Sequence, residues 1–148
     1  MTFTLERIKR RRATPEADFQ SRLVAVLRDR LMDAVVFHIP NGVNMPIPAA
    51  MKLRRMGLLS GIPDLGILHS GGKILFLECK ADKGTASPTQ IAMFAEMRRL
   101  GHRVDIVRDV SEALEYCADV GIRISESNVR DASALFKQES MGVRRRRA

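Results

Sequence analysis

The sequence predicts an α/β domain with a mixed β-sheet, in the element order α-β-α-β-β-α-β-α, with a central hairpin flanked by helices. Segments with apolar residues at helical spacing alternate with short apolar, β-branched runs, a pattern typical of a sheet layered with helices. Two of the runs are separated only by Ser70-Gly71-Gly72, which indicates a hairpin and therefore a sheet that is not fully parallel. At 148 residues and 45% apolar, the chain is expected to form one domain.

The first helix is indicated by its N-terminal residues and by one apolar stripe. Thr14 is a typical N-cap, and Pro15 suits the first helical position. The stripe predicts a helix that reaches about Met32, and its members are Phe19, Leu23, Val26, Leu27 and Leu31.

Turn residues separate the next four elements. Pro40-Asn41-Gly42 ends a β-branched run, Gly57 ends a short helical pattern, and the glycines at 71 and 72 join the two hairpin strands. We therefore expect, in order, a strand over 34–39, a helix over 48–56, and strands over 62–68 and 73–81.

The clearest helix of the chain begins after Ser87. Ser87 and Gln90 have the spacing of a capping box around Pro88. A helix is predicted over 88–100, where Gly101 follows, and another over 111–120, where Gly121 follows. Between them, a run of buried-strand character predicts a strand over 103–108. We divide the chain into a basic arm (1–13), one domain (14–124) and a C-terminal tail (125–148) with a marginal helix and an Arg-rich end.

The net charge of +8 lies at the two ends of the chain. The first twelve residues and Arg144 to Arg147 each carry +4, so the remainder is neutral. Basic ends bind phosphates without sequence preference, but they are equally often solvated tails, and charge alone leaves both open. No apolar run is long enough to span a membrane and no signal peptide is indicated, so a cytoplasmic protein is expected. Cys79 and Cys117 show no metal or disulfide spacing and are expected to be reduced and buried.

Glu78 and Lys80 stand out within the second hairpin strand. Because side chains alternate along a strand, they share one face, while the apolar Leu77 and Cys79 take the other. Burying charges costs several kcal/mol unless they are paired or bind a metal. An edge-strand salt bridge, with Asp64 as a turn residue after Pro63, accounts for these residues as well, since an ExK pattern is common.

Phosphodiester hydrolysis gives a chemical reason for the same residues. The carboxylates of Asp64 and Glu78 suit a divalent cation that acidifies a water, and Lys80 suits orienting or deprotonating that water. Hard oxygen ligands without Cys or His side chains favour Mg²⁺ or Mn²⁺ over Zn²⁺.

The order of four motifs resembles a known family. Gly61-Ile62-Pro63-Asp64-Leu65, a glycine-turn hairpin, Phe76-Leu77-Glu78-Cys79-Lys80-Ala81 and Ser87-Pro88-Thr89-Gln90 resemble the VRR-NUC branch of the PD-(D/E)XK nuclease superfamily over about 15–108. The resemblance implies a restriction-endonuclease-like core and a metal-dependent DNA endonuclease. It places the catalytic residues at Asp64, Glu78, Lys80 and Gln90, and the metal ligands at Asp64, Glu78, Glu16 and the backbone carbonyl of Cys79.

Glu16 and Gln90 are also suited to purely structural roles in their helices. Glu16 extends the apolar stripe by one turn and would point toward the sheet, yet an acid in the first turn also complements the helix dipole. Gln90 caps its helix in either case, and a glutamine can cap while contacting a phosphate or a metal-bound water.

Further residues are candidates for DNA contact. Asn41 lies in a turn near the proposed site, and the short helix carries Lys52, Arg54 and Arg55. A plain turn and a solvated helix face are the alternatives. His38 has no histidine partner at metal-binding spacing and is expected to be satisfied or partly exposed.

The predicted function is a Mg²⁺- or Mn²⁺-dependent DNA endonuclease that is structure-selective, with branched or junction DNA as its substrate. A nuclease domain that must cut two strands favours a homodimer with two sites. The alternative is a non-catalytic nucleic-acid-binding or assembly protein on a nuclease-like fold.

Overall fold

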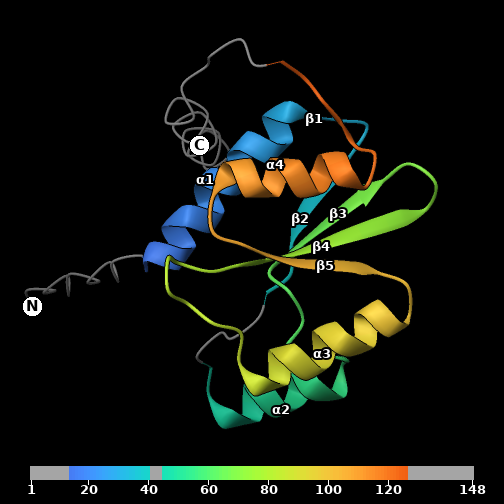
Figure 1. Ribbon diagram of the computed structural model, residues 1–148. Helices are drawn as coiled ribbons and strands as arrows, with labels where there is room; N and C mark the ends of the chain where they lie inside the picture. The colour runs from blue at the N-terminus through green and yellow to red at the C-terminus, as the bar shows by residue number, and fades with distance from the viewer. Residues whose placement is uncertain (1–13, 41–44, 127–148) are drawn as a thin grey trace, which may run out of the picture.

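The computed structural model describes residues 14–40 and 45–126. These residues form four helices and six strands. Four of the strands make one sheet with helices on both sides (Figure 1), and the first and last strands pair as a separate two-stranded sheet. The elements are α1 (Pro15–Arg30), β1 (Leu31–Met32), β2 (Val35–His38), α2 (Ile47–Arg55), β3 (Leu65–His69), β4 (Lys73–Cys79), α3 (Pro88–Arg99), β5 (Arg103–Val107), α4 (Val110–Asp119) and β6 (Arg123–Ile124).

The main sheet is mixed, as the hairpin predicts. Its strand order is β2-β3-β4-β5, with β2–β3 and β3–β4 antiparallel and β4–β5 parallel. In the β3–β4 hairpin, Leu65 lies opposite Leu77 and Gly66 opposite Phe76. This register fixes which side chains of the two strands meet, and it therefore decides the geometry of the site described below.

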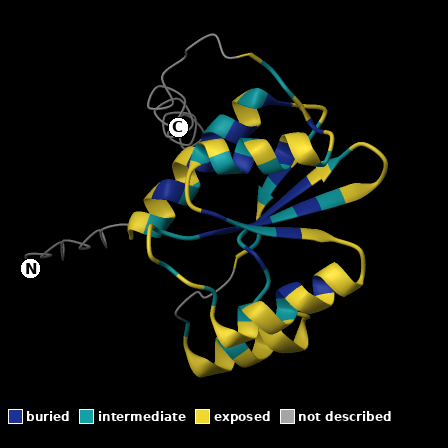
Figure 2. Cartoon of the chain, in the orientation of Figure 1, coloured by how far each residue is buried: buried dark blue, intermediate teal, exposed yellow. Residues whose placement is uncertain are grey.

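Helices cover both faces of the sheet, with α1 and α4 on one side and α2 and α3 on the other (Figure 1). The larger cluster packs Leu23 and Leu27 of α1 against Leu75 and Leu77 of β4. The smaller one packs α3 against the opposite face, and its buried members are Phe94, Met97 and Val104. Figure 2 shows buried residues along the strands and exposed residues on the outer helix surfaces. The predicted α/β class with both sheet faces covered is confirmed.

Three side chains cap the helices. Thr14 Oγ1 accepts from the amide of Ala17 at 3.2 Å. At α3, the predicted capping box is present in both directions. At α4, Asp109 accepts from the amide of Glu112 at 2.8 Å. The last helix thus begins at Val110, before the predicted 111, because the carboxylate of Asp109 serves as the N-cap.

The prediction that the first helix reaches Met32 is wrong by two residues. Leu31 and Met32 form β1, which pairs with β6 as Leu31↔Ile124 and Met32↔Arg123. Ser125, where the sequence suggests that the tail begins, is held to the end of α1 by its amide, which donates to the carbonyl of Arg30 at 2.8 Å. These contacts join residues more than 90 positions apart in the chain, so a local pattern does not reveal them.

The first hairpin strand begins three residues later than predicted, at Leu65 instead of Ile62. Pro63 has no amide hydrogen to donate to a strand ladder. Asp64 therefore precedes the strand, and its carbonyl accepts from the amide of Ile39 at 2.8 Å. The consequence is that the Asp64 side chain stands at the end of the sheet.

Within the described residues, no helix has the length and apolar character needed to cross a membrane.

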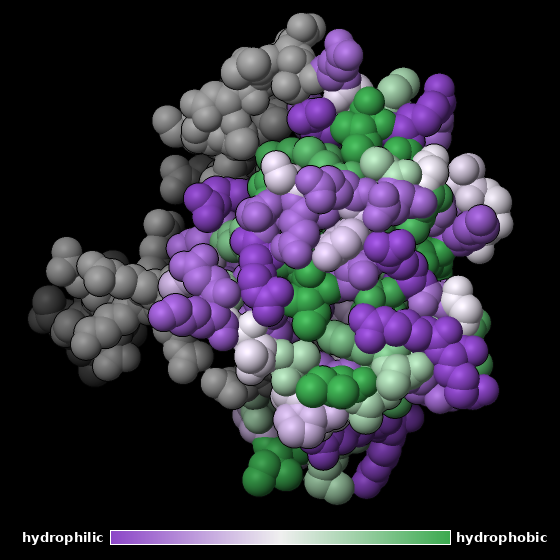
Figure 3. Space-filling model, in the orientation of Figure 1, coloured by the Kyte–Doolittle hydropathy of each residue, from purple (hydrophilic) through white to green (hydrophobic). Residues whose placement is uncertain are grey.

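Cys79 and Cys117 are free and buried, and burial raises the pKa of each thiol to about 12. Polar and charged residues cover much of the face seen in Figure 3, with smaller hydrophobic areas between them.

Gly66 of β3 lies against the ring of Phe37, its neighbour on β2. A Cβ atom built there would lie 2.3 Å from Cζ of Phe37. We expect Gly66→Ala to lower the free energy of unfolding by roughly 1–3 kcal/mol, as overpacking does. In urea denaturation, adding Phe37→Leu is expected to recover part of that loss. If the stability loss of the double variant equals the sum of the losses of the two single variants, the ring of Phe37 is not the cause of the loss in Gly66→Ala.

Candidate active site

The hairpin register brings Asp64 and Glu78 together. Leu65 lies opposite Leu77, so the next pair of positions in this register is Asp64 and Glu78. Because side chains alternate along a strand, these two side chains lie on the same face of the hairpin. The amide of Cys79 donates to Asp64 Oδ2 at 2.9 Å, which fixes that carboxylate. Two carboxylates thus project from neighbouring strands at one end of the sheet.

Glu78 is buried to 1% exposure and uses one of its two oxygens for protein contacts. Oε1 accepts from Lys80 Nζ at 2.7 Å and from Gln90 Nε2 at 2.5 Å. Oε2 is buried and has no hydrogen-bond partner among the residues that the structure describes. A buried carboxylate oxygen without a partner is rare and costly, and it suits a ligand that binds there.

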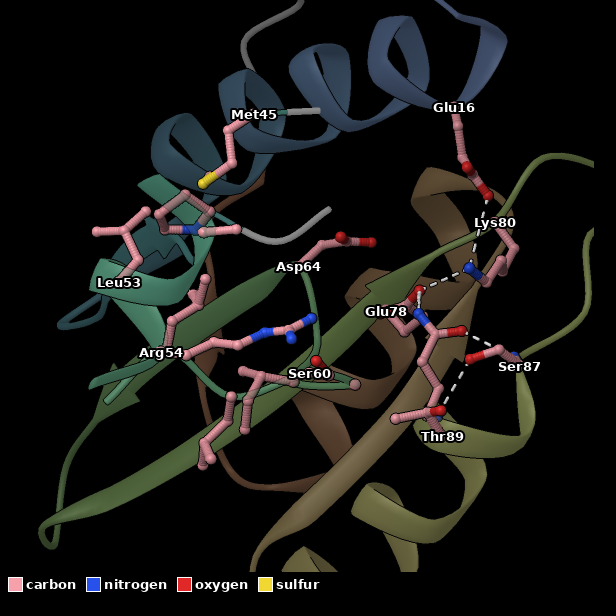
Figure 4. Close-up of a pocket in the computed structure, with 17 residues that line it drawn as sticks. Glu16, Met45, Leu53, Arg54, Ser60, Asp64, Glu78, Lys80, Ser87 and Thr89 are labelled. Carbon is pink, nitrogen blue, oxygen red and sulfur yellow. Dashed lines mark hydrogen bonds and ion pairs between the residues drawn. The ribbon is translucent and has the colours of Figure 1, made fainter. Parts of the chain in front are cut away.

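Gln90 performs two tasks at once: the helix cap that the sequence predicts and a contact within the site, which the sequence left open. Its Oε1 accepts from the amide of Ser87 at 2.9 Å to complete the cap of α3. Its Nε2 donates to Glu78 (Figure 4). The cap therefore fixes the amide orientation that holds Glu78 in place.

Glu16 reaches the same site from the first turn of α1. Its carboxylate lies 3.8 Å from Lys80 Nζ, with 45% of the side chain exposed. Lys80 is therefore located between Glu16 and Glu78 (Figure 4). The inward orientation predicted from the apolar stripe is present, and the position in the first turn also favours an acid.

The site concentrates negative charge, since three carboxylates share the single ammonium of Lys80. Burial raises the pKa of Asp64, and the charge of Glu16 adds to this, against the lowering effects of the Cys79 amide and Lys80. Burial likewise raises the pKa of Glu78, and Asp64 adds to it. Burial alone would lower the pKa of Lys80, but its hydrogen bond to Glu78 and the nearby carboxylates outweigh this and raise it. The ammonium of Lys80 is therefore held in its charged form.

The raised pKa of Asp64 predicts a pH dependence of stability in the metal-free protein. An acid with a raised pKa in the folded state contributes stability that is present below its unfolded value, near 3.8, and is lost as the pH rises through the folded value. Asn cannot ionise, so Asp64→Asn is expected to gain stability relative to wild type as the pH rises from about 4 toward neutral. Urea denaturation in EDTA across this range measures the difference. A difference that stays constant with pH would contradict the assigned cause.

The oxygen donors fit a divalent cation. Asp64 and Glu78 each commit one oxygen to the protein, and Asp64 Oδ1 and Glu78 Oε2 make no hydrogen bond with the described residues. In residues 14–40 and 45–126, no three His, Cys, Asp or Glu side chains are grouped as a complete metal cage. Mg²⁺ is commonly held by one or two carboxylates, with water and phosphate oxygens completing its shell, so two carboxylates are sufficient.

A cavity of about 640 Å³ opens at these residues. Glu16, Asp64, Glu78, Lys80 and Gln90 all line it, so the cavity brings together every side chain predicted to be catalytic or to bind the metal (Figure 4). The backbone of Cys79 is used at the same place, where its amide binds Asp64.

The predicted DNA contacts separate into three groups. Arg54 lines the cavity, whereas Lys52 and Arg55 are exposed and do not line it. Asn41 lies outside the described residues. His38 is exposed, as expected, and its Nδ1 lies 2.8 Å from Gln20 Nε2 and 3.0 Å from the carbonyl of Asp64.

The sequence did not identify the wall of the cavity opposite the carboxylates. This wall includes Met45, Leu53, Leu58 and Leu59, which lie on α2 and in the segments on either side of it. The apolar positions of α2 carried a signal, but without the fold nothing indicated that this helix faces the site. Gly61 belongs to the motif already noted, and it lets the loop before Asp64 approach the backbone of Thr89.

Comparison with solved structures identifies the fold. A "VRR_NUC domain protein" superimposes with a TM-score of 0.54 and 20% sequence identity, covering 74% of this chain and 89% of its own length. The fold is that of a VRR-NUC domain. The predicted resemblance is confirmed at this level, including the restriction-endonuclease-like arrangement of a mixed sheet between helices.

Sequence comparison adds one relative of the VRR-NUC-like chain. It is 38% identical over 56 residues to "Putative nuclease p44" of Acyrthosiphon pisum secondary endosymbiont phage 1. The match covers 36% of this chain and 60% of that protein, so the chain spans under two thirds of its relative. No family model matches the sequence.

Proposed function

We propose that the protein is a nuclease that hydrolyses DNA with Mg²⁺ or Mn²⁺. The observation that carries this proposal is the pair of carboxylates, Asp64 and Glu78, which line the same cavity and each have one oxygen without a hydrogen bond to the described residues. Lys80 and Gln90 hold Glu78 from the other side. The similarity to a phage protein named as a nuclease, and the VRR-NUC fold, support the same chemistry.

In the proposed mechanism, Asp64, Glu78 and the backbone carbonyl of Cys79 would hold the cation, with Glu16 at the rim. When bound, the cation supplies Lewis acidity to the phosphate and to a water. In the metal-free protein the pKa of Lys80 is raised by its hydrogen bond to Glu78 and by the nearby carboxylates. In the mechanism Lys80 would orient or deprotonate the attacking water, and its ammonium would donate to a phosphoryl oxygen as charge develops there.

Gln90 acts through Glu78 in this mechanism. Its amide keeps Oε1 turned toward the protein, which leaves Oε2 for the ligand. Glu78 is 1% exposed, so it has little room to rotate. Gln90 is thus proposed as a positioning residue, and its cap on Ser87 fixes it in turn.

The test is a cleavage assay of the full chain with linear, flapped and four-way DNA, each with Mg²⁺, Mn²⁺ or EDTA. We expect cleavage that requires a divalent cation and is abolished by EDTA. Absence of cleavage of all three DNAs with both metals would overturn the nuclease proposal. It would leave the non-catalytic nucleic-acid-binding or assembly protein in its place.

We further propose branched DNA as the preferred substrate and a homodimer as the active form. One site cuts one strand, so cutting both strands of a branch in concert requires two sites. Sedimentation analysis is expected to give twice the mass of one chain, and the four-way DNA is expected to be cut faster than the linear one. A monomer that cuts linear DNA equally well would contradict this finer proposal without contradicting nuclease activity.

A further inference from the structure

Arg54 stands alone among the basic residues of α2 in facing the cavity. The residues of α2 that line it are Ala50, Leu53 and Arg54. Positions three and four apart share one face of a helix. Arg55 is turned by about 100° from Arg54, since a helical turn contains 3.6 residues. The helical rotation therefore selects one arginine of the adjacent pair.

The guanidinium of Arg54 is free to bind a ligand. It forms no hydrogen bond or ion pair with the residues that the structure describes. Arg54 is exposed, and no residue of α2 is buried. In Figure 4 it extends from α2 across the cavity toward the side where Asp64 and Glu78 lie. An arginine presents a planar fork of donors that matches a phosphate in two-point contact.

Besides Arg54, α2 and the segment that follows it contribute mainly aliphatic side chains to the cavity lining. Leu53 is 37% exposed and Leu59 54% exposed, and both line the cavity. Within a duplex, neighbouring base pairs cover the faces of each base, so an aliphatic wall reaches a base face only when that base has left the stack. The guanidinium of Arg54 next to an aliphatic surface matches one nucleotide. The phosphate would bind the guanidinium, and the sugar and base would lie on the aliphatic side chains.

We propose that Arg54, Leu53 and Leu59 form a nucleotide-binding wall that takes one unpaired nucleotide next to the scissile phosphate. This inference rests on the proposed function and specifies its substrate as DNA with an unpaired nucleotide at the cut. Arg54 binds the backbone phosphate of that nucleotide from the side opposite the carboxylates. Asp64 and Glu78 repel the phosphates around them, and Arg54 offsets this repulsion.

The matched control for Arg54 is Arg55, because both are exposed arginines of the same helix and the two alanine variants have the same net charge. Binding is measured by fluorescence anisotropy in EDTA, with labelled oligothymidylate of about eight nucleotides and a hairpin duplex of similar length. We expect Arg54→Ala to weaken oligothymidylate binding about 10-fold or more, as loss of a charged hydrogen bond does. Arg55→Ala is expected to weaken it less than about 3-fold, and Arg54→Lys to be intermediate. Equal losses in Arg54→Ala and Arg55→Ala would overturn the proposal.

Leu59→Ser tests the aliphatic part of the wall without changing charge. We expect it to weaken binding of oligothymidylate several-fold while the duplex is bound as by wild type, because only an unpaired base exposes its face. Equal weakening for both DNAs, or for neither, would overturn the assignment to an unpaired nucleotide.

These measurements do not depend on cleavage. If wild type cuts DNA but Arg54→Ala and Arg55→Ala bind alike, the wall is wrong and the nuclease proposal stands. If wild type cuts nothing and Arg54→Ala alone loses oligothymidylate binding, the wall stands as a binding site for an unpaired nucleotide, while the nuclease proposal and the place of the wall beside a scissile phosphate fail.

Discussion

Asp64→Asn is expected to lower the rate of metal-dependent DNA cleavage by on the order of 10³-fold or more. The substitution keeps the shape of the side chain and an oxygen that can accept from the amide of Cys79. It removes the negative charge that the cation requires, in a site where the two proposed carboxylate ligands each leave one oxygen free. The effect should appear in the rate constant of the cleavage step, measured under single-turnover conditions with Mg²⁺ and Mn²⁺.

Asp82→Asn is the matched control for charge. Asp82 is an exposed residue of the loop after β4 and does not line the cavity. Its variant should cut DNA at close to the wild-type rate. Asp64→Asn should also be at least as stable as wild type near neutral pH without metal, because a carboxylate whose pKa is raised by burial has been removed. A variant that lost activity by unfolding would instead show a lower urea midpoint, and this would contradict the assigned role.

Local rules predicted the central residues of the site. The alternation of side chains along a strand placed Glu78 and Lys80 on one face, and the structure joins them at 2.7 Å. A capping pattern predicted the start of α3, and with it the position of Gln90. Each of these inferences needed residues within a few positions of one another, which is the range over which backbone periodicity is regular.

The rest depended on contacts between distant parts of the chain. The contact of Gln90 with Glu78 requires α3 to be packed beside β4, and the choice of Arg54 over Arg55 requires the rotation of α2 about its axis. The β1–β6 pairing joins the residues directly after α1 to Arg123 and Ile124. Charge was the least informative signal, since the basic runs of the sequence lie at 1–13 and 144–147, outside the described residues.

Gly61→Ala is expected to reduce both stability and activity, because two separate constraints apply at this residue. Its φ of +83° is in the left-handed region, which costs an L-residue roughly 1–2 kcal/mol. A Cβ atom there would also lie 2.7 Å from the carbonyl oxygen of Thr89. That neighbour is backbone at the start of α3, so it cannot rotate away. Overpacking adds roughly 1–3 kcal/mol, and we expect a total loss of about 2–5 kcal/mol in urea denaturation.

Gly57→Ala separates the two contributions to this loss. Gly57 has a φ of +103°, yet a Cβ atom there would meet nothing within 4 Å. Gly57→Ala should therefore lose only the conformational part and retain activity. In Gly61→Ala, relief of the clash must move the loop before Asp64 away from the start of α3, where Gln90 holds Glu78. A displacement of about 1 Å between catalytic groups can cost on the order of 10²-fold in rate. If both variants lost the same stability and kept the same activity, the contact between Gly61 and Thr89 would have no part in holding Asp64 and Glu78 together.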